Sequence, residues 1–195
     1  MSRALELFME KGRIKEEVKN AIKELSKKSL KEILAYMLRG EIDSTRMYRF
    51  LHENLPDGYP KDRFREFLEM ERNHDLEVSR VFRELFPGEE VPGVHLKSWT
   101  GIFWEKDYRL KTVDDYLKVL EIGMDAEQLS EMAYRMLAEL LENPEHKKLM
   151  ESLAQDEREH YEFLKQEYDF YSRVEHQKTL KELIEELKRD RRDKE

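Results

Sequence analysis

Apolar side chains recur at intervals of three and four residues along almost the whole chain, which is the period of an amphipathic α-helix. Turn signals between these stretches are few, because the 195 residues include only 7 Gly and 5 Pro. The pattern predicts an all-α protein. Helices are expected over residues 3–26, 30–54, 61–86, 113–142, 144–175 and 179–192.

Capping signals set several of these boundaries. Residues 29–32 (Ser-Leu-Lys-Glu) and 179–182 (Thr-Leu-Lys-Glu) are capping boxes, in which hydroxyl and carboxylate groups satisfy free amides at a helix start. Asn143-Pro144 is an N-cap followed by proline in the first turn. The segment 56–60 (Pro-Asp-Gly-Tyr-Pro) ends the first long helix.

The four long helices form two closely connected pairs joined by a long crossover at 87–111, which lacks a helical period. Trp99 and Trp104 lie in this crossover and are expected to pack over the bundle. This order of connections is typical of a ferritin-like antiparallel four-helix bundle. We expect that bundle over residues 29–175. An N-terminal amphipathic helix in 1–28 and a C-terminal amphipathic helix with a charged tail in 176–195 would flank it.

An internal repeat with an offset of 86 residues carries the chemistry. Of the six histidines, only two have a glutamate three residues earlier, in Glu-x-x-His motifs at 71–74 and 157–160. The same offset superposes two further pairs, Glu41 on Glu127 and Tyr48 on Tyr134. Each half therefore reads Glu-x6-Tyr, then 22 residues, then Glu-x-x-His. The other four histidines, His52, His95, His146 and His176, lack ligand spacing and are expected at the surface.

The repeated groups fall on apolar helix faces. Residues three apart share a helix face, and so do residues seven apart. Burying four carboxylates and two imidazoles without partners would cost many kcal/mol, and two divalent cations would supply those partners. The predicted metal ligands are Glu41, Glu71, His74, Glu127, Glu157 and His160.

Within this set we expect Glu71 and Glu157 to bridge the two ions. Each imidazole would bind one ion, and Glu41 and Glu127 would complete the two coordination spheres. Tyr48 and Tyr134 have two interpretations. They are either core tyrosines with any hydrogen-bond partner, or partners of ligating carboxylates in the second shell of the site.

Composition restricts the possible metal ligands, partners and cellular location of the protein. The sequence contains no cysteine, so any metal must be held by carboxylate and imidazole. The net charge of −8 argues against a nucleic-acid partner. No apolar stretch is long enough for a membrane helix and no secretory pattern is present, so we expect a cytoplasmic protein. The high Glu, Lys and Arg content is typical of hyperthermophile proteins.

Over residues 30–175 the sequence resembles the rubrerythrin branch of the ferritin-like superfamily. The resemblance is carried by Gly40-Glu41 with Tyr48, by Glu127 with Tyr134, and by the run 154–160 (Ala-Gln-Asp-Glu-Arg-Glu-His). It implies a non-haem di-iron site that reacts with hydrogen peroxide or dioxygen in oxidative-stress defence. The six predicted ligands take the family's ligand positions.

Two departures from that family matter. Full-length rubrerythrins carry a four-cysteine rubredoxin domain, which these residues lack, so the resemblance implies a separate electron donor such as a rubredoxin. Ser130 also stands where rubrerythrins often have a further carboxylate, which makes the site more symmetric and closer to that of bacterioferritins.

The hypothesis is therefore a rubrerythrin-like peroxidase or oxidoreductase that holds two iron ions. Two alternatives remain open from the sequence. One is a ferroxidase or iron-storage protein, and the other is a non-catalytic scaffold whose site holds manganese or zinc. A homodimer is expected, and the long crossover could exchange helix pairs between chains.

Overall fold

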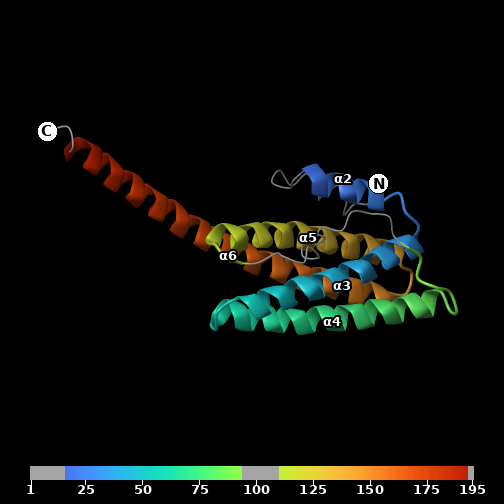
Figure 1. Cartoon of the computed structure of the whole chain (residues 1–195). Coiled ribbons are helices and arrows are strands. Elements are labelled where there is room, and N and C mark those ends of the chain that lie inside the picture. Colours follow the sequence, from blue (N-terminus) through green and yellow to red (C-terminus); the bar gives the residue numbers. More distant parts are fainter. Residues whose placement is uncertain (1–15, 94–109, 193–195) are drawn as a thin grey trace.

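The computed structural model describes residues 16–93 and 110–192, and of residues 176–192 it describes the backbone. Within these residues it contains five helices and no strand, which confirms the all-α prediction (Figure 1). The crossover residues Trp99, Trp104 and His95 lie outside the described part. The helices are α2 (Glu16–Leu25), α3 (Leu30–Asn54), α4 (Tyr59–Leu85), α5 (Val113–Leu140) and α6 (Pro144–Arg192).

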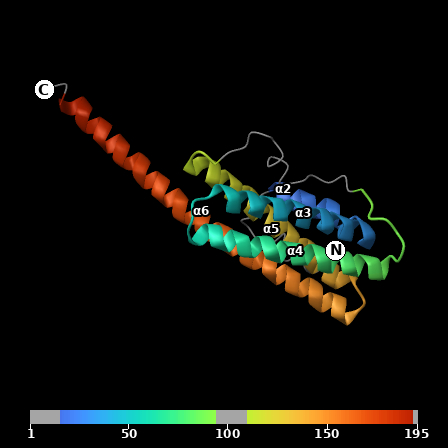
Figure 2. The same cartoon turned by 60° about the horizontal axis from the view of Figure 1, so that its bottom comes forward.

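Helices α3 to α6 form the antiparallel four-helix bundle. The two closely packed pairs are α3 with α4 and α5 with α6, and α3–α5 and α4–α6 contacts join the pairs. Helix α2 lies along α5 at the side of the bundle (Figures 1 and 2), where its Val18, Ile22 and Leu25 are fully buried. The short connections are 55–58 and 141–143, and the long one is 86–112, as the ferritin-like prediction requires.

The predicted starts of α3, α5 and α6 are confirmed. Ser29 Oγ accepts a hydrogen bond from the Glu32 amide at 3.3 Å, and the Glu32 carboxylate accepts one from the Ser29 amide at 2.9 Å. Thr112 and Asp115 form the equivalent box at α5. The first turn of α6 is capped by Asn143.

The capping box of α3 makes a pH prediction. Hydrogen bonds from the Ser29 backbone, the Ser29 hydroxyl and Lys28 lower the pKa of Glu32 from 4.5 to about 2. Because the pKa is lower in the folded protein than in the unfolded chain, the ionised Glu32 carboxylate stabilises the folded state at pH values above 4.5. This stabilisation is lost as the pH falls from 4.5 through about 2. In Ser29→Ala the pKa of Glu32 will rise toward 4.5, measured by carboxyl NMR titration.

The matched control for that titration is Thr112→Ala, which alters the α5 box alone. It should shift the pKa of Asp115, which Lys111 and Thr112 now hold low, and leave Glu32 unchanged. An unchanged Glu32 pKa in Ser29→Ala would show that the hydroxyl does not hold the carboxylate.

The predicted break between a helix ending at 175 and a separate C-terminal helix at 179 is wrong. One helix, α6, runs without interruption for 49 residues, about 74 Å, and extends beyond the bundle (Figures 1 and 2). The physical reason lies in residues 172–178, which contain neither Gly nor Pro, so nothing ends the helix before the capping pattern at 179–182.

The interior of the bundle is layered along its axis. One apolar cluster surrounds residues 33–38 of α3 and 78–82 of α4, and a second surrounds 47–51 and 64–68 of the same helices. Buried polar side chains occupy the layer between the two clusters. Helices α5 and α6 also contribute apolar residues to both clusters and buried polar residues between them. All four helices therefore place polar groups in one layer of the bundle, and the apolar clusters exclude water on both sides of that layer.

Candidate metal centre

The structure brings all six predicted ligands together in this polar layer. Helices α3 and α5 each supply one glutamate, and α4 and α6 each supply a Glu-x-x-His pair. Each of the six residues is at most 3% exposed. They form two overlapping groups in which the candidate ligand atoms lie within 4.8 Å of one another. The groups are Glu41, Glu71, His74 and Glu157, and Glu71, Glu127, Glu157 and His160.

The first group is arranged around the His74 imidazole. Its Nδ1 lies 3.1 Å from Glu157 Oε1, 3.5 Å from Glu41 Oε2 and 3.8 Å from Glu71 Oε2. Three carboxylates from three helices therefore face one ring nitrogen. A cation at this position would have oxygen and nitrogen donors on all of those sides.

The second group repeats this geometry around the His160 imidazole. Its Nδ1 lies 2.9 Å from Glu71 Oε1, 3.6 Å from Glu157 Oε2 and 3.9 Å from Glu127 Oε2. Glu71 and Glu157 thus direct one oxygen to each imidazole, while Glu41 and Glu127 belong to one group each. This grouping is the one expected if Glu71 and Glu157 bridge two ions, a role that stays a prediction.

Two tyrosines connect the halves crosswise. Tyr48 on α3 donates a 2.6 Å hydrogen bond to Glu127 Oε1 on α5, and Tyr134 on α5 donates one to Glu41 Oε1 on α3. Each bond occupies one carboxylate oxygen and leaves Oε2 facing an imidazole. Burial, reinforced by the nearby carboxylates, raises the pKa of both phenols, so both hydroxyls remain protonated donors.

The two halves differ at the outer side of the imidazoles, a feature that the sequence reasoning missed. His74 Nε2 lies 3.2 Å from the carboxylate of Asp156, which is adjacent to Glu157 on α6. The repeat offset aligns Asp156 with Met70, so the equivalent carboxylate is missing in the other half. His160 Nε2 has no hydrogen-bond partner among the described residues, and its ring lies against Phe67 with centroids 4.2 Å apart.

This asymmetry predicts that the two metal positions differ in affinity. A carboxylate on the outer nitrogen orients a ligating imidazole, and removing such a partner costs about 10–100-fold in metal affinity. Asp156→Ala will weaken the His74 position by that factor and leave the His160 position unchanged. Anaerobic titration with Fe²⁺ against a competing chelator measures the affinity of both positions. Asp169→Ala is the control, because Asp169 is a carboxylate on the same helix that pairs with Lys165 and lies outside the Glu/His groups. Two unaltered equivalents in Asp156→Ala would contradict the prediction.

Two other histidines differ in part from the expected surface positions. His146 is wrongly predicted, because it is only 5% exposed and its Nε2 lies 2.7 Å from Glu84 of α4. It occupies the first turn of α6, which packs against the end of α4. His52 is half-buried, with Nδ1 3.1 Å from the Lys61 carbonyl oxygen. Neither belongs to the Glu/His groups.

The residues present fit a pair of divalent cations. Several of their buried atoms lack a hydrogen bond among the described residues: Glu41 Oε2, both oxygens of Glu71, Glu127 Oε2 and both nitrogens of His160. Burial raises the pKa of Glu71 well above its usual range and that of Glu127 to about 8. Two divalent cations would balance the four carboxylates and use the uncompensated atoms as ligands.

A four-helix bundle with one long crossover and paired Glu/His groups in its interior defines a ferritin-like helical protein with a candidate dinuclear metal site. The family model described as Rubrerythrin matches residues 32–168, which is most of the chain. The chain belongs to the rubrerythrin family.

A solved structure extends the similarity. It is a hypothetical protein from Pyrococcus furiosus that is 26% identical, with a TM-score of 0.67, and the match covers 78% of this chain and 96% of that one. No curated protein matches the sequence. In the described part of the chain, no helix has both the length and the apolar character needed to cross a membrane.

Proposed function

We propose that this protein is a non-haem di-iron redox enzyme that reduces hydrogen peroxide or dioxygen, using electrons from a separate donor protein. The observation that carries the proposal is the sharing of Glu71 and Glu157 between the two Glu/His groups. Shared carboxylates hold two ions side by side, which suits a two-electron reaction better than two isolated sites would. Membership of the rubrerythrin family supports the same reaction class.

The ligands would be Glu41 and His74 for one ion, Glu127 and His160 for the other, and Glu71 and Glu157 for both. Carboxylate and imidazole donors of this kind are typical of di-iron bundles, although manganese and zinc fit the same donors. When bound, two ferrous ions supply the two electrons that cleavage of the peroxide O–O bond requires.

The chain itself excludes water and fixes the ligand orientation. The apolar clusters above and below the polar layer keep bulk solvent away from the carboxylates. The hydroxyls of Tyr48 and Tyr134 hold Glu127 and Glu41 in place while keeping their protons. Ser44 and Ser130, each one turn after a candidate ligand and related by the repeat, are buried hydroxyls available near the site for proton transfer.

Stopped-flow mixing tests the proposal. The protein, loaded anaerobically with Fe²⁺, is mixed with hydrogen peroxide and separately with dioxygen, and ferric absorbance is followed. We expect two irons per chain and rapid oxidation by at least one oxidant. A site that neither oxidant oxidises would reject the function. Iron retention well beyond two per chain, in an assembly of many subunits, would replace it with iron storage.

A further inference from the structure

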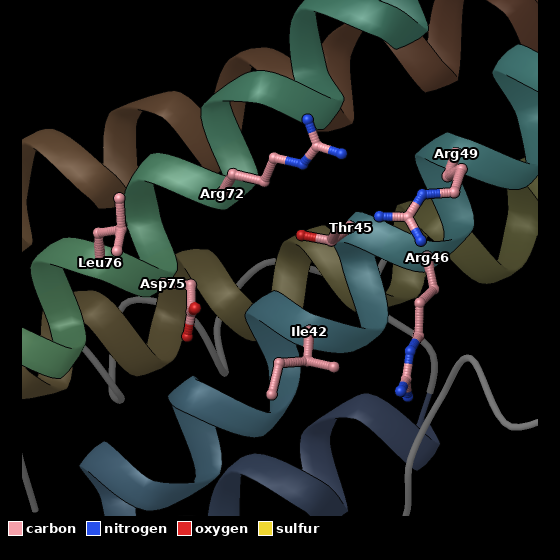
Figure 3. A pocket seen from close by; sticks show the side chains of 7 residues that line it. All are labelled: Ile42, Thr45, Arg46, Arg49, Arg72, Asp75 and Leu76. Carbon is pink, nitrogen blue, oxygen red and sulfur yellow. The ribbon is translucent and has the colours of Figure 1, made fainter.

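A hollow of about 380 Å³ lies on the outer face of the bundle, between α3 and α4. Figure 3 shows the side chains that line it, with Ile42, Thr45 and Arg49 coming from α3 and Arg72 and Leu76 from α4. We call it the Arg49–Arg72 groove. None of its lining residues belongs to the Glu/His groups.

Positive charge converges at one end of the groove. The side chains of Arg49 and Arg72 extend toward one another across the helix seam, with Thr45 between them (Figure 3). Arg72 forms a 2.6 Å ion pair with Glu69, but Arg49 has no acidic partner among the described residues. The one carboxylate in the groove, Asp75, lies toward the other end, near Ile42 (Figure 3). In a chain of net charge −8 this is a local concentration of positive charge.

Exposed apolar side chains line the other end of the groove, on either side of Asp75 (Figure 3). Ile42 is 41% exposed and Leu76 is 64% exposed. Arginine next to exposed apolar residues is typical of protein interfaces, where the apolar contact supplies affinity and the charge supplies specificity. A small anion would leave both apolar side chains in water, whereas an acidic protein surface would cover them.

The position of the groove connects it to the metal centre. Ile42 follows Glu41 in the sequence, Arg72 follows Glu71, and Asp75 follows His74, so the two side chains of each pair diverge by about 100° around the same helix. A partner seated in the groove would be separated from the Glu/His groups by no more than about one helix diameter, 10–12 Å.

We propose that the Arg49–Arg72 groove is the docking surface for an acidic electron-carrier protein. The inference rests on the proposed function and names the surface through which that function is supplied with electrons. Carboxylates of the carrier would pair with Arg49 and Arg72, and an apolar side chain would contact Ile42 and Leu76. Two carriers, each losing one electron, return the two electrons that one hydrogen peroxide takes, with two protons, to form two waters.

Charge reversal tests the proposal with a reduced rubredoxin of net negative charge as the probe. The variant Arg49→Glu/Arg72→Glu is compared with Lys118→Glu/Lys148→Glu, which makes the same charge change at exposed positions of α5 and α6. The iron-loaded protein is oxidised with peroxide and then mixed with the carrier. We expect the groove variant to lower the second-order rate at least tenfold at low salt, and the control variant to stay within about threefold.

Two further measurements separate the possible failures. The rate at which peroxide oxidises the ferrous protein should be equal in all three proteins. A wild-type protein that neither peroxide nor dioxygen oxidises would reject the proposed function alone. Calorimetric binding of oxidised rubredoxin to the oxidised protein tests docking without electron transfer. It should be lost in the groove variant and weakened in Ile42→Ser/Leu76→Ser.

Equal losses in both charge-reversed variants would overturn the proposal, because the effect would then be one of net charge. Binding of inorganic phosphate in the groove, without binding of rubredoxin, would also overturn it and assign the groove to a small anion.

Discussion

Replacing Glu71 with glutamine will abolish binding of both metal ions and at the same time make the metal-free protein more stable. Glu71 directs one oxygen toward each imidazole, so its loss affects both positions together. An ion that binds only the folded state stabilises it by about 4 kcal/mol when its concentration is 1,000 times the dissociation constant. Wild-type protein should lose stabilisation of this size per ion on chelation, and Glu71→Gln should lose almost none.

The expected gain in stability of metal-free Glu71→Gln follows from the desolvation of the Glu71 carboxylate. Burial is the largest cause of the raised pKa of Glu71, and repulsion from Glu157 and Glu41 adds to it. A neutral amide of the same shape avoids the cost of burying a charge beside two other carboxylates. We therefore expect a higher melting temperature for metal-free Glu71→Gln than for metal-free wild type.

The measurements are metal content after gel filtration and thermal unfolding with and without chelator. Glu66→Gln is the matched control, because Glu66 lies on the same helix, is exposed and pairs with Arg63 at the surface. It should keep both metals and the wild-type melting temperature. A variant Glu71→Gln that retains two ions, or that is less stable than wild type without metal, would refute the assignment.

The grouping of the six predicted ligands in one layer could be predicted from the sequence, because the helical period and the repeat fix which side chains share a helix face and a level along the bundle. Two residues three or seven apart must share a face, and an apolar face must enter the core. The start of α3 at Ser29 could also be predicted, because its capping box joins residues only three positions apart.

Features that depend on contacts between helices were not accessible in this way. The sequence places Tyr48 near Glu41 on α3, yet the hydroxyl reaches across to Glu127 on α5. Asp156 has no repeat counterpart, and only the packing of α6 against α4 brings it to His74. The Arg49–Arg72 groove joins residues of two helices that no spacing relates. The burial of His146 depends on where α4 ends, which the spacing of residues around His146 does not indicate.

The second large effect concerns the crosswise tyrosines. Tyr48→Phe will weaken the metal position served by Glu127 and His160, and Tyr134→Phe will weaken the position served by Glu41 and His74. Each loss should be about 10–100-fold in affinity, the size expected when a hydrogen-bond partner of a ligating group is removed. Without the phenol, Oε1 competes with Oε2 to face the ion, and the carboxylate loses its fixed orientation.

Tyr116→Phe provides the control that separates this effect from a general loss of stability. Tyr116 is also a buried tyrosine, and its hydroxyl donates a 3.1 Å hydrogen bond to Glu167, a carboxylate outside the metal groups. Its removal should cost about 1 kcal/mol of folding stability and leave Fe²⁺ affinity unchanged. If the three phenylalanine variants bind Fe²⁺ equally well in anaerobic competition titrations, Tyr48 and Tyr134 stabilise the core only. If Tyr48→Phe and Tyr134→Phe each weaken the binding of a different Fe²⁺ ion, each half of the sequence repeat supports one of the two metal positions.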